Sequence, residues 1–343
     1  MSGERWLALD GLRGVAILLV IVAHAQVLSM NVGGMVGVTL FFVLSGFLIT
    51  NLLIQELDKT GGIDLRKFYG RRVLRLLPAL VVYLFGITFV MILLRLDIPV
   101  VDIIWPPLLY VANYVQILGT DLFAHRHTWS LAVEEHFYLL WPLLVGLGAA
   151  KRTRLLGLAV VLLIGWRFMA YQISSNPQWG YTGTDTNAYA LGIGALLAAV
   201  RKESGLPVPP RNVAALSVAG LVLLSLMRIS TLDGLYRVSA WVTVVAALLA
   251  VVAVWSSVES RELGFLTGRT LRWFGLVSYS LYLWHAPILL FPGLSETRLS
   301  RLFAVGLGVV AAWLSWKFVE GPILRSRFRH RLSAPRGSLA PTP

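Results

Sequence analysis

Residues 7–30 have the sequence LALDGLRGVAILLVIVAHAQVLSM, an apolar stretch long enough to form a membrane-crossing α-helix. A helix rises about 1.5 Å per residue, so about 20 residues span a hydrocarbon core of about 30 Å. The stretch is too long for a signal peptide, contains Arg13 and His24, and lacks a small-residue cleavage site. We therefore expect a membrane helix that the mature protein keeps.

Apolar stretches of similar length recur along the whole chain. Of its 343 residues, 57% are hydrophobic and 14% are charged, whereas soluble domains carry roughly 25% charged residues. Because only helices satisfy their own backbone in lipid over such unbroken runs, we expect an all-α fold, a polytopic bundle of transmembrane helices. Hydropathy predicts about ten spans, over residues 8–29, 35–56, 74–94, 129–149, 155–173, 187–200, 212–229, 237–256, 273–293 and 300–319.

The segment 103–118 is a weaker candidate because it is short and contains Trp105-Pro106-Pro107 and Asn113. If it does not cross, the loops rich in Lys and Arg all fall on one side of the membrane. The positive-inside rule then places both termini in the cytoplasm of a bacterial-type cell. We expect one membrane domain over residues 1–323 and a basic cytoplasmic tail over 324–343, whose composition permits disorder.

The net charge of +13 does not indicate a nucleic-acid partner. The basic residues collect in loops between apolar segments, a pattern that reports orientation in the membrane. Because the chain has no cysteine, thiolate metal sites and cysteine nucleophiles are excluded. We expect no metal cofactor, and the chemistry must use His, Glu, Asp, Ser, Tyr or Arg.

Ionisable side chains inside the predicted spans are few. Each is costly in lipid, so such residues usually face a cavity and mark function. Away from the ends of the spans they are Arg13, His24, Glu134, Glu135, His136, Arg167 and His285.

Three of these residues fall at a similar depth near the outer surface: His24, Glu134 and His285. Arg13 shares a helix face with His24 and lies roughly 16 Å below it. A carboxylate beside an imidazole raises its basicity and fixes its tautomer, so we expect Glu134 to orient His24 as a general base. Each residue could instead hydrogen-bond a neighbouring helix, but the common depth favours a proton-transfer site.

An arginine cluster, Arg71, Arg72 and Arg75, stands at the cytoplasmic mouth of the third span. A guanidinium binds phosphate through two parallel hydrogen bonds, so the cluster suits a phosphorylated ligand. The alternative is topology determination together with contact to anionic lipids.

Six motifs in this order resemble an integral membrane family, acyltransferase family three. Its members O-acylate lipopolysaccharide, peptidoglycan, other exported glycans and some macrolide antibiotics. The motifs cover nearly the whole chain: LDGLRGVA (9–16) followed by His24, FFVLSGFLI (41–49), RRVLRLLP (71–78), TWSLAVEEHFYLLWP (128–142), SYSLYLWH (278–285) and EGP (320–322).

The resemblance implies roles for these residues and a donor, usually acetyl-CoA and otherwise another acyl-CoA. It carries over onto Arg13, His24 and Glu134 as residues needed for activity, and onto Arg72 and Arg75 as residues linked to the donor. We expect His24 and Glu134 to be catalytic, and Arg13, Arg71, Arg72 and Arg75 to bind the phosphates of coenzyme A. We further expect His285, with Ser278, Tyr279 or Glu135, to position the acceptor or to stabilise the oxyanion.

The chain departs from the family pattern within TDTNAY (184–189), where Asn187 and Tyr189 stand in place of the Arg and Asp of a frequent Arg-Ala-Asp. This predicts altered acceptor contacts near the outer end of the sixth span. Longer relatives also carry an extracytoplasmic hydrolase-like domain. Without one, the membrane domain would complete the transfer itself or pass the acyl group to a separate protein.

The sequence thus predicts a membrane O-acyltransferase that moves an acyl group from a coenzyme A thioester to a hydroxyl. The acceptor is a glycan, a lipid-linked sugar or a small molecule. Acyl chain length, an acyl-enzyme intermediate and oligomeric state are left open. The alternative is a transporter or flippase with His24, Glu134 and His285 as a proton relay, although no inverted repeat or pair of broken helices supports it.

Overall fold

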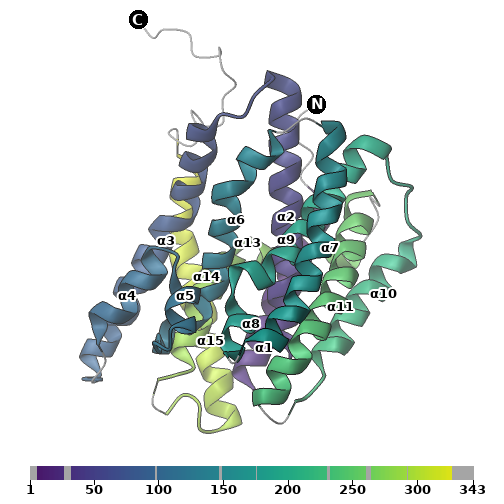
Figure 1. Cartoon of the computed structure of the whole chain (residues 1–343). Helices are drawn as coiled ribbons and strands as arrows, with labels where there is room; N and C mark the ends of the chain where they lie inside the picture. The colour runs from purple at the N-terminus through teal and green to yellow at the C-terminus, as the bar shows by residue number, and fades with distance from the viewer. Residues whose placement is uncertain are drawn as a thin grey trace, which may run out of the picture.

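The computed structural model describes residues 6–26, 32–96, 99–146, 149–174, 176–229, 232–259, 264–291 and 293–326, and all the secondary structure in these ranges is helical (Figure 1). In chain order the helices are α1 (Leu7–Ala25), α2 (Gly33–Thr60), α3 (Leu65–Leu93), α4 (Val100–Leu108), α5 (Ala112–Ile117), the 3₁₀-helix η1 (Phe123–Thr128), α6 (Trp129–Val145), α7 (Ala149–Ile173), α8 (Pro177–Thr182), α9 (Thr184–Ser204), α10 (Arg211–Ser225), α11 (Leu232–Glu259), α12 (Gly264–Thr267), α13 (Arg269–Leu276), α14 (Ser278–Ile288), α15 (Arg298–Ser315), the π-helical turn η2 (Trp316–Glu320) and α16 (Gly321–Arg325).

Six helices in the described residues are long and apolar enough to cross a membrane, judged by length and composition. They are Leu7–Ala25, Gly33–Thr60, Leu65–Leu93, Arg152–Ile173, Val238–Glu259 and Arg298–Arg325. The expected multi-pass helical architecture is therefore present. The remaining predicted spans fall on the shorter or less apolar helices α6, α9 and α10 and on the pair α13 and α14, so the count of ten stays a prediction, as does the orientation of the termini.

Two of the predicted segments fall on pairs of short helices. Segment 103–118 falls on α4 and α5, of 9 and 6 residues. At about 1.5 Å per residue, neither helix reaches across a hydrocarbon core of about 30 Å. The predicted span over 273–293 falls on two helices, because Val277 ends α13 and begins α14.

Close packing of α1 against α12 and α13 explains two glycines of the LDGLRGVA motif. A Cβ on Gly11 would lie 1.9 Å from the carbonyl oxygen of Leu266, and one on Gly14 would lie 2.1 Å from that of Leu271. Such distances leave no room for any side chain, so the small residues allow the helix backbones to touch, as is common in membrane bundles. This packing fixes α1, and with it Arg13, in the middle of the bundle.

Helix α2 packs in the same way against α9. A Cβ on Gly46 would lie 1.9 Å from the carbonyl oxygen of Leu191, and one on Gly194 would lie 2.0 Å from that of Val43. The most closely packed part of the bundle consists of α1, α2, α7, α9 and α11. Helix α3 lies outside this part, beside α14 (Figure 1).

The arginine cluster lies in the first turns of α3, which begins earlier than the predicted span. Asp64 caps this helix, its side chain accepting a 3.1 Å hydrogen bond from the Lys67 backbone amide. On a helix, residues three apart share a face, so Arg72 and Arg75 point in similar directions. Tyr279 ties α14 to this part of α3 by donating a 3.0 Å hydrogen bond to the Leu76 carbonyl.

Candidate active site

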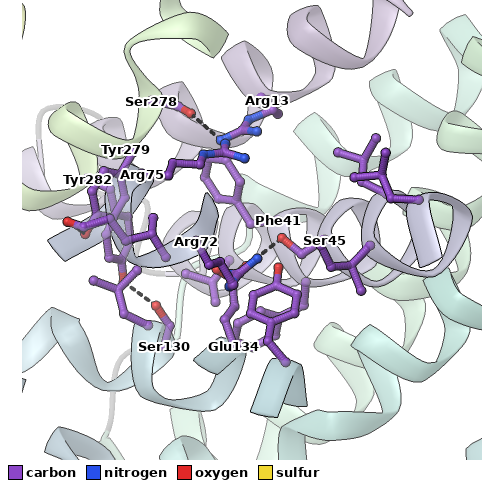
Figure 2. Close-up of a pocket in the computed structure, with 18 residues that line it drawn as sticks. Arg13, Phe41, Ser45, Arg72, Arg75, Ser130, Glu134, Ser278, Tyr279 and Tyr282 are labelled. Atoms are coloured by element: carbon purple, nitrogen blue, oxygen red, sulfur yellow. Dashed lines mark hydrogen bonds between the residues drawn. The ribbon is translucent and has the colours of Figure 1, made fainter. Parts of the chain in front are cut away.

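A cavity of about 270 Å³ lies between α1, α2, α3, α6 and α14 (Figure 2). We call it the arginine chamber. Its polar lining consists of Arg13, Ser45, Arg72, Arg75, Ser130, Glu134, Tyr138, Ser278, Tyr279 and Tyr282. Apolar side chains, among them Phe41, Phe42, Leu48, Ile49 and Leu52, form the rest. A cationic end beside an apolar wall suits a ligand with an anionic group and an uncharged arm.

Two of its three arginines are held by neighbours in the bundle. Arg13 donates a 3.2 Å hydrogen bond from Nη2 to Oγ of Ser278. Arg72 forms an ion pair with Glu135, with Nη2 2.8 Å and Nε 3.1 Å from Oε1, and its guanidinium carbon lies 3.1 Å from the centroid of the Tyr138 ring. Both side chains are therefore set before any ligand arrives.

The third arginine, Arg75, has an exposed side chain that lines the chamber. It forms no ion pair with any residue that the structure describes. Its charge is thus available to an anion.

Arg71 and Glu135 do not take the places expected from the sequence. Arg71 lies on another side of α3, where it pairs with Glu56 at 3.5 Å, and it does not line the chamber. Glu135 is the ion-pair partner of Arg72 and does not line the chamber. Its carboxylate therefore orients a guanidinium, and the expected role toward the acceptor or oxyanion stays a prediction.

Glu134 belongs to the arginine side of the site. Its Oε1 accepts a 2.7 Å hydrogen bond from the Ser45 hydroxyl (Figure 2). The carboxylate also lies close enough to Arg13 and Arg72 to interact with both charges. The expected pairing of Glu134 with His24 is wrong, because the two side chains line different cavities and each has another hydrogen-bond partner.

His24 lines a second cavity of about 500 Å³, which we call the histidine chamber. Its walls come from α1, η1, α6, α8 and the segment around α5. They include His24, Gln116, Asp121, Arg126, His127, Trp129, Asn176, Gln178 and Tyr181. At its exposed rim, hydrogen bonding to Arg126 holds the pKa of the Asp121 carboxyl below its ordinary value.

The tautomer of His24 follows from its backbone contact. Nδ1 lies 2.9 Å from the carbonyl oxygen of Val20, and a carbonyl can only accept, so Nδ1 carries the proton. The Nε2 of this exposed side chain then keeps its lone pair and has no hydrogen-bond partner within the described ranges. An imidazole held in this way is prepared to take a proton at Nε2.

His285 and His127 lie behind His24. The ring centroid of His285 is 5.0 Å from that of His24 and 5.5 Å from that of His127. The structure thus brings together His24 and His285, as the sequence predicted, but adds a third imidazole. His127 precedes the motif TWSLAVEEHFYLLWP and lies outside the predicted spans, so a search for ionisable residues within the spans could not find it.

Ser130 and Tyr282 were also missed by the sequence analysis. Their hydroxyl oxygens are 2.6 Å apart, and the Tyr282 hydroxyl donates a 2.6 Å hydrogen bond to the carbonyl of His127. Both residues line the arginine chamber, whereas His127 lines the histidine chamber. These three residues therefore form part of the wall between the two chambers.

Ser278 and Tyr279 line the arginine chamber and hydrogen-bond Arg13 and the Leu76 carbonyl, respectively. The hydroxyls that accompany His285 in the wall are instead those of Ser130 and Tyr282.

Asn187 and Tyr189, the positions that depart from the family pattern, are buried and support the interior. Asn187 accepts a 3.2 Å hydrogen bond from the buried Arg167 and donates one of 2.9 Å to the Tyr181 carbonyl. Tyr189 lies beneath the Arg167 guanidinium, 5.4 Å from ring centroid to guanidinium carbon. These residues hold the segment that carries Tyr181 without lining the histidine chamber.

No group of three or more His, Cys, Asp or Glu residues that could hold a metal ion occurs in the described ranges.

Residues 6–320 match a family described as "Acyltransferase domain". The chain belongs to this acyltransferase family. It is 33% identical to the "Peptidoglycan O-acetyltransferase OatA" of Listeria monocytogenes over 94% of this chain and 56% of that protein. It is also 33% identical to the "O-acetyltransferase OatA" of Staphylococcus aureus over 96% of this chain and 59% of that protein. The chain thus spans less than two thirds of the length of these relatives, and no solved structure matches it.

Proposed function

We propose that this chain is a membrane O-acetyltransferase that moves an acetyl group from acetyl-CoA to a hydroxyl of a cell-envelope glycan. The observation that carries the proposal is the pair of adjacent chambers, one cationic and one lined by a base, with Ser130, Tyr282 and His127 in the wall between them. Its membrane domain covers residues 1–323, with residues 324–343 as a basic tail. With cytoplasmic termini, the arginine chamber opens toward the cytoplasm.

The arginine chamber binds the coenzyme A thioester. Arg75 supplies a charge that is not already paired, and Arg13 and Arg72 are oriented by Ser278 and Glu135. Guanidinium groups bind phosphate oxygens strongly, because each of these hydrogen bonds is assisted by charge. The pantetheine arm then runs along the apolar wall toward Ser130, and Glu134 balances the charge of the arginines around it.

The histidine chamber binds the acceptor. The rings of Trp129 and Tyr181 lie 5.3 Å apart in its wall, near the side-chain amides of Asn176 and Gln178. Aromatic faces and amides together suit a sugar, whose ring has apolar faces and polar edges. A glycan acceptor also agrees with the name of the peptidoglycan O-acetyltransferase relative.

His24 acts as the general base. The acetyl end of the thioester enters between the side chains of Ser130, Tyr282 and His127. There Nε2 of His24 removes the proton from the acceptor hydroxyl while the oxygen attacks the thioester carbonyl carbon. The carbon–sulfur bond breaks, the His24 imidazolium returns its proton to the sulfur, and coenzyme A leaves into the arginine chamber as the thiol. A positioned base of this kind accelerates such a step by about 10²–10⁴.

The purified chain in detergent tests the proposal directly. Acetyl-CoA and soluble peptidoglycan fragments are supplied, and free coenzyme A and acetylated glycan are measured. An enzyme releases coenzyme A in step with acetylated glycan and needs no membrane gradient. A transporter or flippase would release none, and that outcome would contradict the proposal.

A further inference from the structure

Acetyl transfer places a negative charge on the carbonyl oxygen of the thioester. When the acceptor oxygen attacks, the carbonyl carbon becomes tetrahedral and its oxygen becomes an oxyanion. A hydrogen-bond donor fixed in advance near this oxygen lowers the barrier, and one such donor is worth about 10²–10³ in kcat. If the chain performs the proposed acetyl transfer, on which this inference rests, a free N–H or O–H is expected where the acetyl end meets the histidine chamber.

Most of the protons around this point are already committed to hydrogen bonds. The Tyr282 hydroxyl donates to the His127 carbonyl at 2.6 Å. The Ser130 hydroxyl, 2.6 Å from the Tyr282 oxygen, must then donate to that oxygen. In their neutral forms His24 and His285 each donate from Nδ1 to a carbonyl of the preceding helical turn. None of these four side chains therefore has a proton free for an oxyanion.

The side chain of His127 is the exception. It is 6% exposed, and neither of its ring nitrogens has a hydrogen-bond partner within the described residues. The backbone of Leu283 approaches the ring outside hydrogen-bonding geometry. A neutral imidazole carries one N–H, whichever nitrogen holds the proton, so one donor is unused. Buried polar groups in native proteins are nearly always paired, and an unpaired imidazole therefore calls for a function.

Neighbouring rings hold the imidazole of His127 in place. Its centroid lies 5.3 Å from that of Tyr282, 5.5 Å from that of His285 and 6.0 Å from that of Tyr83. The backbone of His127 is fixed as well, because its carbonyl accepts the Tyr282 hydrogen bond. A donor held in this way needs no rearrangement when negative charge develops beside it.

The position of His127 also suits an oxyanion donor. It lines the histidine chamber together with His24, the proposed base. Its contact with Tyr282 brings it to the wall, where Tyr282 and Ser130 line the arginine chamber (Figure 2). An acetyl group that enters between these side chains therefore meets the His127 ring and the acceptor in one place. A base and an oxyanion donor around one reacting carbon are what acyl transfer needs.

We propose that His127 is the oxyanion-binding residue of the acetyl transfer and donates its free ring N–H to the thioester oxygen. The acceptor oxygen bonds to the carbonyl carbon as its proton passes to Nε2 of His24. The electron pair of the C=O double bond moves onto the oxygen that His127 binds. The C=O bond then re-forms, the C–S bond breaks, and the proton on His24 passes to the sulfur. His127 keeps its own proton throughout.

Hydroxylamine as an acceptor separates an oxyanion donor from a general base. Its nitrogen attacks acetyl-CoA without prior removal of a proton and gives acetohydroxamate and coenzyme A thiol. Loss of the base should therefore matter much less with hydroxylamine than with a sugar hydroxyl, whereas loss of an oxyanion donor should slow both reactions. Purified variants receive acetyl-CoA with either peptidoglycan fragments or hydroxylamine, and kcat and KM are measured above the enzyme-free rate.

His127→Phe keeps a ring and removes the donor, so kcat should fall by about 10²–10³ with either acceptor while KM for acetyl-CoA stays near the wild-type value. His127→Leu serves if His127→Phe folds poorly. His127→Gln restores an N–H donor and should recover kcat to within about tenfold of the wild type, which a merely structural ring would not allow. His24→Ala should lose rate with the glycan and keep most of it with hydroxylamine.

His125→Phe is the matched control. His125 belongs to the same short helix, η1, is equally buried, and hydrogen-bonds the Tyr83 hydroxyl at 2.7 Å. Because it lines neither chamber, its substitution should leave kcat with both acceptors near the wild-type value.

Rescue of His127→Phe by hydroxylamine would assign this residue to proton removal and overturn the oxyanion role. Equal losses in His127→Phe and His127→Gln, or wild-type kcat in both, would overturn it too, while the wild type still makes acetylated glycan. A wild type that acetylates neither acceptor would contradict the proposed function, and the oxyanion role with it. A loss with both acceptors in His127→Phe that His127→Gln recovers supports the assignment.

Discussion

The imidazole rings of His24 and His285 meet edge to face, with their centroids 5.0 Å apart, although they belong to α1 and α14. Each ring hydrogen-bonds through Nδ1 to the carbonyl four residues earlier, Val20 for His24 and Leu281 for His285. The two rings therefore share one tautomer, and both keep a lone pair at Nε2. Only His24 is exposed to a chamber, which makes it the group that meets substrate.

His24→Ala should lower kcat for acetyl transfer by about 10²–10⁴, because it removes the base that deprotonates the acceptor. KM for acetyl-CoA should change little, since the donor binds in the other chamber. His136→Ala is the matched control: His136 hydrogen-bonds Thr184 at 2.8 Å and lines neither chamber. Steady-state kinetics of the purified variants check this. A His24→Ala protein that is folded and as fast as the control would remove the base from the account.

Arg75→Ala should weaken acetyl-CoA binding roughly tenfold to hundredfold, the value of one charged hydrogen bond of about 1.5–3 kcal/mol. Arg71→Ala should leave this affinity near that of the wild type, because Arg71 pairs with Glu56 away from the chamber. Calorimetric titration with coenzyme A compares the two variants. Equal effects of both substitutions would show that the cluster acts through its net charge and not through this chamber.

Glu135→Gln should lower the stability of the protein, because it leaves the largely buried guanidinium of Arg72 without its ion-pair partner. Losing a charged partner costs about 1–3 kcal/mol, which thermal unfolding in detergent can detect. Glu134→Gln keeps an acceptor for Ser45 and should reduce stability less. Its main effect should be on donor affinity, through Arg13 and Arg72. The reverse order of stabilities would show that Glu134, and not Glu135, holds the arginines.

Gly46→Ala should destabilise the bundle by about 1–3 kcal/mol or more, because its Cβ would lie 1.9 Å from the Leu191 carbonyl oxygen and force α2 away from α9. Gly157→Ala is the matched control, since its Cβ meets nothing within 4 Å. In an open helical position alanine is favoured by about 0.5–1 kcal/mol. Thermal unfolding should therefore shift in opposite directions for the two variants, and similar shifts would contradict close packing of α2 on α9.

Hydropathy predicted where most helices lie, because apolar length is the main constraint that a membrane imposes. It could not reveal the break at Val277, since this residue is apolar and continues the run. The break follows from tertiary packing, in which α13 lies against α1 and α14 against α15. The distance of each histidine from the outer end of its predicted span, by contrast, correctly indicated that His24 and His285 lie close together.

The partner of Glu134 was mispredicted for a different reason. Depth along a helix axis does not fix rotation about that axis, and α6 turns Glu134 toward Ser45 of α2. His127 escaped notice because it lies in η1, outside the apolar runs. Residues such as Ser130 and Tyr282 carry no charge, so only their positions in three dimensions identify them as parts of the wall.

Sealed proteoliposomes test the central claim, that donor and acceptor approach the wall from separate chambers. Acetyl-CoA is enclosed and peptidoglycan fragments are added outside, and the yield of acetylated glycan is compared with that from vesicles given both substrates outside. The account predicts product when the substrates are on opposite sides and little or none when they share one side. Equal product in both arrangements would show that both substrates enter from one face, which would contradict the two-chamber site.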